Sequence, residues 1–108
     1  MTQVTFYSDS SHNYTGFRFK GHAGFAESGK DIVCAAISVL VFNTINSIEE
    51  LTDDKFELKM DEKTGFIDFH FTDVISHESE ILMNSLVIGI KGVKEDNEKY
   101  IQIVFKEV

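Results

Sequence analysis

One stretch of this sequence constrains the fold more than any other, because residues 32–42 are apolar at every position except Ser38. Apolar side chains would surround a helix at the start of this stretch, and Ile45, Ile48 and Leu51 then recur at helical spacing. The stretch is shorter than the roughly 20 residues that a membrane span requires. We therefore predict a central helix that is buried at its start and amphipathic toward its end, and we expect no contact with a membrane.

Alternating apolar and polar residues predict five strands around this helix. The alternating segments contain Val4 and Phe6, then Phe17 and Phe19, then Phe56 to Met60, then Ile67 to Phe71, and finally Ile101 to Phe105. The third and fourth segments, separated by DEKTG, form the clearest hairpin pattern.

A second helix is predicted between the fourth and fifth strands. Thr72 or Asp73 can cap its start, and its end is expected near Gly92. Its expected apolar face contains Ile75, Leu82, Leu86 and Ile90. The resulting order ββαββαβ predicts an α+β fold, with two helices on one face of a mostly antiparallel or mixed five-stranded sheet.

The composition favours one domain, residues 1–108, because the chain has no proline, no low-complexity tract and no internal repeat. Eighteen acidic residues against ten basic ones give a formal net charge of −8. This charge opposes direct nucleic-acid binding. It would favour encounter with a basic protein partner, although the acidic surface of an ordinary cytosolic domain is the simpler explanation. The only cysteine, Cys34, excludes an internal disulfide and indicates a reducing compartment. The N-terminal residues show no secretory pattern, so we expect the cytoplasm.

Cys34 is a candidate nucleophile, because we expect it in the first turn of the central helix, just after Ser28, Gly29 and Asp31 as possible caps. A helix N-terminus stabilises negative charge and so favours the thiolate, which is the nucleophilic form of a cysteine. His22, at the expected end of the second strand, can lie beside this turn and act as the base. A buried cysteine that only packs is the competing interpretation.

Three further groups near the helix start have two possible roles each. The N–H groups of residues 32–34 can face a developing oxyanion. Asp31 can orient His22 or, as we favour, cap the helix. Ser38, one turn beyond Cys34, can support the site, although a serine inside a helix more often bonds a backbone carbonyl.

The segment between His22 and the helix is rich in glycine, which predicts a loop that admits a peptide. This loop contains Ala23, Gly24, Phe25 and Gly29. Phe25 can help form an apolar substrate pocket or simply anchor the loop. The other histidines are His12, His70 and His77, which have no evident partner. They and Cys34 lack the spacing of metal ligands, so we expect neither a metal nor a cofactor.

The segment GHAGFAESGKDIVCAAIS, residues 21–38, closely resembles the signature of the ribosomal-processing cysteine proteases, a bacterial family. The matching residues are Gly21, His22, Ala23, Gly29, Asp31, Ile32, Val33, Cys34, Ala35 and Ser38. The resemblance assigns the nucleophile to Cys34 and the catalytic histidine to His22, and it also marks Gly21, Asp31 and Ser38 as important. The chain length and the order of elements are similar to the whole family domain.

This resemblance implies a cysteine endopeptidase that removes the N-terminal extension of a large-subunit ribosomal protein. It also implies cleavage after an aromatic residue and a homodimeric enzyme. A different function remains open from the residues alone, namely a non-catalytic ribosome-assembly module in which Cys34 packs and the acidic surface binds a basic partner. A redox sensor is disfavoured, because the chain has no second cysteine to resolve an oxidised thiol.

Overall fold

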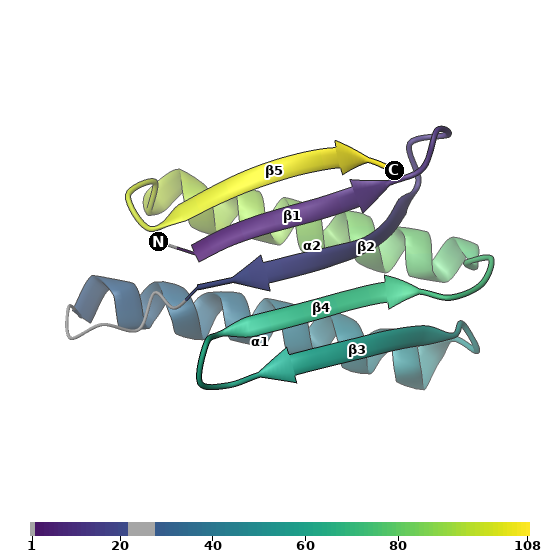
Figure 1. Cartoon of the computed structure of the whole chain (residues 1–108), viewed down its shortest axis with the longest axis horizontal. Helices are drawn as coiled ribbons and strands as arrows, with labels where there is room; N and C mark the ends of the chain where they lie inside the picture. Colours follow the sequence, from purple (N-terminus) through teal and green to yellow (C-terminus); the bar gives the residue numbers. More distant parts are fainter. Residues whose placement is uncertain (1, 22–27) are drawn as a thin grey trace.

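The computed structural model describes residues 2–21 and 28–108, with the backbone alone for residues 28–31. Among these residues, five strands and two helices follow one another in the predicted order (Figure 1). Their bounds are β1 Thr2–Ser8, β2 Tyr14–Lys20, α1 Ser28–Leu51, β3 Phe56–Asp61, β4 Phe66–Phe71, α2 His77–Asp96 and β5 Ile101–Glu107. The predicted α+β class and the order ββαββαβ are confirmed.

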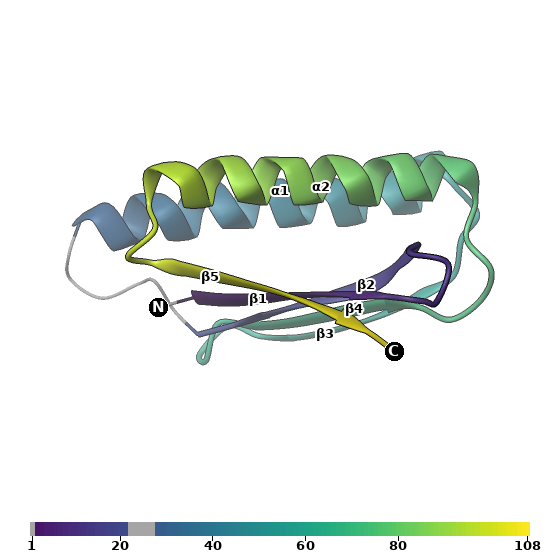
Figure 2. The same ribbon diagram turned by 90° about the horizontal axis from the view of Figure 1, so that it is seen from above.

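The strands form one mixed sheet in the order β3-β4-β2-β1-β5. The pairs β1–β2, β2–β4 and β3–β4 are antiparallel, whereas β5 is parallel to β1. This parallel pair exists because α2 carries the chain back along the whole sheet before β5 begins, as Figure 1 shows. Both helices cover the same face of the sheet (Figure 2).

The core lies between the helices and the sheet and is rich in aromatic rings. Phe17 and Phe69 are fully buried on neighbouring strands, and their rings stack with centroids 4.9 Å apart. From α1, Val33, Ile37 and Val41 are buried against this layer. The buried faces of the strands and one face of α1 therefore form a single core. The prediction that the start of this helix is buried is only partly confirmed, because Ile32 and Val39 face away from the core and are exposed.

The hydropathy of α1 extends further than the apolar stretch at its start. Residues Ile32–Leu51 have a mean hydropathy of 1.7, enough in length and composition to cross a membrane. A helix that forms part of a protein core passes the same test, and Ile45 and Ile48 are buried in the core as well. Core packing therefore accounts for one face of α1, whereas Ile32 and Val39 of the same apolar stretch are each 69% exposed.

The second helix differs from its prediction at both ends. Its N-cap is Ser76, not Thr72 or Asp73, and its C-cap is Asn97. The helix therefore starts after Ile75 and continues past Gly92. Both predicted ends failed because several polar residues near each end can cap a helix, and tertiary contacts choose among them.

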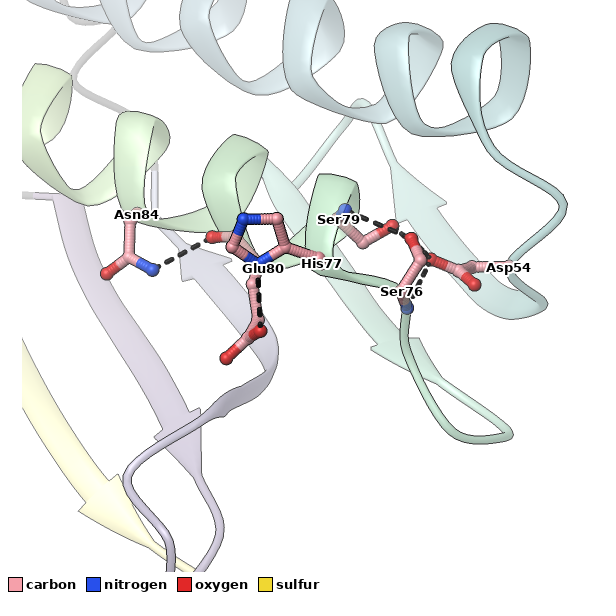
Figure 3. A network of polar contacts seen from close by, with 6 residues as sticks. All are labelled: Asp54, Ser76, His77, Ser79, Glu80 and Asn84. Atoms are coloured by element: carbon pink, nitrogen blue, oxygen red, sulfur yellow. Dashed lines mark hydrogen bonds and ion pairs between the residues drawn. The ribbon is translucent and has the colours of Figure 1, made fainter.

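Asp54, in the loop after α1, fixes the start of α2 (Figure 3). Its Oδ2 accepts hydrogen bonds from the Ser76 backbone N–H at 3.0 Å, from the Ser76 hydroxyl at 2.6 Å and from the Ser79 hydroxyl. The Ser76 hydroxyl oxygen in turn accepts from the Ser79 N–H at 3.2 Å. The loop after the first helix is thereby tied to the cap of the second.

The Asp54 bonds make stability depend on pH. Burial raises the pKa of Asp54, but the hydrogen bonds from Ser76 and Ser79 outweigh it, so the net pKa lies below the ordinary 3.8. Because the folded pKa is the lower one, the contribution of Asp54 is present above pH 3.8 and is lost as the pH falls through the folded value. We expect Asp54→Asn to lower the free energy of unfolding by about 1–2 kcal/mol at about pH 7.

The measurement is urea unfolding of the wild type and of the variant across this acidic range. The difference between them should shrink as the pH falls below 3.8, because wild-type Asp54 then takes up a proton. The neighbouring, exposed Asp53 provides the matched control Asp53→Asn, which should change stability little. A difference that stays constant down to strong acid would contradict the role of the charged carboxylate.

Candidate active site

A cavity of about 270 Å³ lies where α1 passes one end of the sheet. Residues of β1, β2, α1 and the β3–β4 hairpin line this cavity. The residues are Thr2 of β1, Phe19 of β2, Gly21 just after it, Cys34, Ile37, Ser38 and Phe42 of α1, and Met60, Asp61, Glu62, Gly65 and Ile67 of the β3–β4 hairpin. Apolar residues, one cysteine and two acidic residues therefore line one cavity, whose volume is slightly below the roughly 300–1,000 Å³ that is typical of ligand sites.

Cys34 is accessible from this cavity and is not a fully buried packing residue. Its side chain is partly exposed, although it also contacts the core. Val33, its neighbour in the chain, is by contrast completely buried. The competing interpretation, in which Cys34 only packs, is therefore disfavoured by its position.

The expected place of Cys34 in the first helical turn is wrong. The helix α1 begins at Ser28, six residues earlier, so Cys34 lies in the second turn. The stabilisation of charge by a helix terminus fades within the first turn, so it contributes less to Cys34 than the sequence suggested. Gly29 and Asp31 also lie inside the helix and not ahead of it, so neither is the N-cap residue.

The proposed oxyanion donors need correction for the same reason. Only the N–H groups at the very start of a helix lack an intrahelical partner, and because α1 begins at Ser28 these lie before residue 32. The N–H groups of residues 32–34 fall in the hydrogen-bonded body of α1 and are not available as a preformed oxyanion hole. The error arose because Asp31 has the residue type of a cap but stands one turn inside the helix.

His22, Ala23, Gly24 and Phe25 lie outside the described residues, but the chain can be followed to the residue before His22. Gly21 lines the same cavity as Cys34. Its φ of 89° is a conformation that favours glycine, which explains the residue type at this position. Its carbonyl accepts a hydrogen bond from the Thr2 hydroxyl at 3.3 Å. The end of β2 is thus held at the cavity that contains the thiol.

The remaining predicted site residues divide into two groups. Ser38 lines the cavity beside Cys34, as expected for two residues one turn apart on a helix. Gly29 was expected in a substrate loop, but it belongs to the first turn of α1. Asp31 is in the same turn, and its side chain lies outside the part of the chain that the structure describes.

The other three histidines do not line the cavity that contains Cys34. Two of them have acidic neighbours, which the sequence did not indicate. His70 lies 3.5 Å from a carboxylate oxygen of Glu57 and 3.5 Å from one of Asp68, and His77 lies 3.8 Å from Glu80. Among the side chains of residues 2–21 and 32–108, no group of three or more potential ligands is arranged to hold a metal.

Sequence reasoning missed the part of the site that comes from the β3–β4 hairpin. Met60, Asp61 and Glu62 line the cavity, although they are far from Cys34 in the chain. The hairpin itself was evident from the sequence. Which end of it would lie over the thiol was not, because no local pattern reports the packing of a hairpin turn against a helix.

Comparison with known proteins identifies the family of this chain. A model of the cysteine protease Prp family matches residues 1–102. The chain belongs to the Prp family of cysteine proteases. The chain is therefore an enzyme, and a non-catalytic binding module is no longer a competing interpretation.

Proteins named ribosomal processing cysteine protease Prp are similar to this chain. The ribosomal processing cysteine protease Prp of Mycoplasma genitalium is 40% identical over 74 residues, which are 61% of this chain and 74% of that protein. The Bacillus subtilis protein of the same name is 25% identical over 107 residues, covering 95% and 96% of the two chains.

A crystal structure of Prp from S. aureus with a substrate peptide has the same fold. Its TM-score is 0.91 at 24% identity, with 98% of this chain and 100% of the other covered. The overall arrangement of helices and strands is therefore that of a Prp protease.

Proposed function

We propose that this Prp family member removes the N-terminal extension of a large-subunit ribosomal protein, cleaving after an aromatic residue with Cys34 as nucleophile and His22 as base. The observation that carries the proposal is the position of the only cysteine, partly exposed in a cavity that Gly21, the residue before His22, also lines. Relatives named ribosomal processing proteases support the substrate class.

The reaction follows from the chemistry of a thiol and an imidazole. His22 takes the Sγ proton of Cys34, and the thiolate attacks the carbonyl carbon of the scissile peptide bond. The imidazolium then protonates the leaving amine, which departs and leaves a thioester on Cys34. Finally His22 takes a proton from a water molecule as the water oxygen attacks the thioester carbonyl carbon, the C–S bond breaks and releases the carboxylic acid product, and the imidazolium returns its proton to the Cys34 thiolate.

The preference for an aromatic residue is supported by the cavity lining. Phe19, Phe42 and Ile67 present apolar surface next to Cys34. A flat apolar side chain on the substrate gains from leaving water for such a pocket, and aromatic rings pack well on one another. Binding that side chain would hold the following peptide bond near the thiol.

The setting of the enzyme is also part of the proposal. We place it in the cytoplasm, because a single reduced cysteine must remain a thiol to act as a nucleophile. The net charge of −8 suits a basic substrate and opposes nucleic-acid binding. A homodimer is the assembly we expect, and light scattering on the purified protein would measure it.

The proposed function is tested by incubating the protein with a synthetic peptide that spans the N-terminal extension and the start of the mature ribosomal protein. Mass spectrometry should find two products whose masses place the cut directly after an aromatic residue. Protein treated with iodoacetamide beforehand, which blocks the thiol, serves as the control and should give no products. An intact peptide after incubation with untreated protein would reject the function.

A further inference from the structure

The outer edge of β3 carries no neighbouring strand. In the sheet order β3 stands at one end, and in the described chain it pairs with β4 alone. Figure 1 shows β3 at the lower border of the sheet. The backbone N–H and C=O groups along such an edge are a template on which another extended chain can pair.

The side chains of this edge are apolar on one face. Phe56, Leu58 and Met60 alternate along β3, and the ring of Phe56 lies 4.8 Å from the buried Phe69, so this is the face toward the helices. Yet Leu58 is 37% exposed and Met60 is 44% exposed. A strand added beside β3 would cover apolar surface that the fold itself leaves open.

The charged residues of β3 alternate with these and point to the opposite face of the sheet. There Glu57 lies 3.5 Å from His70 of β4. Lys59 stands opposite Asp68 in the β3–β4 register. These charges keep the open face of the sheet polar and leave the edge on the helix side available.

The edge also leads directly to the candidate nucleophile. Met60 belongs both to the exposed apolar row of β3 and to the lining of the cavity that contains Cys34. Asp61, the last residue of β3, lines the same cavity. An extended chain that pairs with β3 would therefore reach the thiol where the strand ends.

We propose that the polypeptide substrate binds as an added β-strand along β3, with apolar side chains at alternate positions packed on Leu58 and Met60. Main-chain hydrogen bonds to a sheet edge supply affinity, and every second side chain supplies specificity. The substrate class is thus an extended segment with apolar residues two apart. This inference rests on the proposed protease function and adds how the substrate is held.

The first test uses Leu58→Ser, because Leu58 belongs to the edge but does not line the cavity. With the long ribosomal-protein peptide, KM should rise by about fivefold to tenfold while kcat stays within about twofold, since the lost contact is remote from the reacting atoms. A short fluorogenic peptide that carries only the residues around the cleavage site should be cleaved equally by both proteins. Ile88→Ser on α2, a position 71% exposed, is the matched control and should leave both KM values unchanged.

The second test replaces single backbone N–H groups of the long peptide by N-methyl groups. Binding to the Cys34→Ser protein, measured by titration calorimetry, should weaken at every second position, because alternate N–H groups of a paired strand point toward its neighbour. An unchanged KM for Leu58→Ser, or a methylation profile without this alternation, would overturn edge binding while leaving the protease function intact. Absence of any cleavage by the wild type would instead reject the function on which the inference rests.

Discussion

Replacing Cys34 by alanine should reduce kcat/KM for the ribosomal-protein peptide by a factor of at least about 10⁴, because no other thiol in the chain can form the thioester. Residual turnover would come from binding alone. The substitution removes one partly exposed sulfur at the wall of a cavity, so the fold should persist. Circular dichroism and a thermal unfolding curve measured beside the cleavage assay would verify this.

The same assay applied to His22→Ala tests the base. We expect a loss of about 10²–10⁴ in kcat/KM, the range that a positioned general base contributes. Free imidazole added to this variant should restore part of the activity in proportion to its concentration, whereas it should not restore Cys34→Ala. Full cleavage by either variant would remove that residue from the mechanism, and absence of rescue would argue that His22 acts only through the local structure.

Replacing Phe69 by alanine should destabilise the protein by about 3–5 kcal/mol, the range for large aromatic residues in a core. Phe69 is 0% exposed, and its ring centroid lies 4.9 Å from that of Phe17 and 5.1 Å from that of Phe71. Since domains are stable by only about 5–15 kcal/mol, this one change would remove a large part of the total. Chemical unfolding monitored by far-ultraviolet circular dichroism would measure the loss.

Phe105→Ala provides the comparison, because Phe105 is 50% exposed on the edge strand β5. Its ring stacks on Phe6 with centroids 5.7 Å apart, and the Lys91 ammonium lies 5.3 Å from its centroid. Because half of its surface already contacts solvent, a loss of only about 1 kcal/mol is expected. Equal losses for the two variants would mean that the packing around Phe69 is less important than its burial indicates.

Most of the fold could be predicted because its elements carry strong local patterns. Phe17 and Phe19 alternate with charged residues, and Phe69 lies in a similar strand, so both the strands and their buried faces were evident. The parallel pairing of β5 with β1 was left open as a mixed sheet. The direction of a strand depends on the end of the sheet at which the preceding helix finishes. The alternation of residues within the strand contains no information about that position.

Helix boundaries were the least predictable feature near the site. Asp31 has the residue type of an N-cap, but α1 begins at Ser28, so both Gly29 and Asp31 lie within the helix. Polar residues and glycine near a helix start are compatible with several boundaries, and differences of one turn are small in local energy. Because the helix starts about one turn earlier than expected, Cys34 lies away from the helix terminus. For the same reason the N–H groups of residues 32–34 are bonded within the helix and are not oxyanion donors.

The sequence by itself determined the elements, their order and the chemistry available. Each of these depends on neighbours within a few positions of the chain, such as the alternation in β3 or the spacing of Cys34 and Ser38 on α1. Only the tertiary structure decided which of these side chains share a cavity. Met60 and Asp61 lie beside Cys34 because the β3–β4 hairpin packs over α1, and packing of this kind depends on the complementary shapes of whole surfaces. The thiol was evident from the sequence, whereas its pocket and the open edge of β3 leading to it were established by the fold.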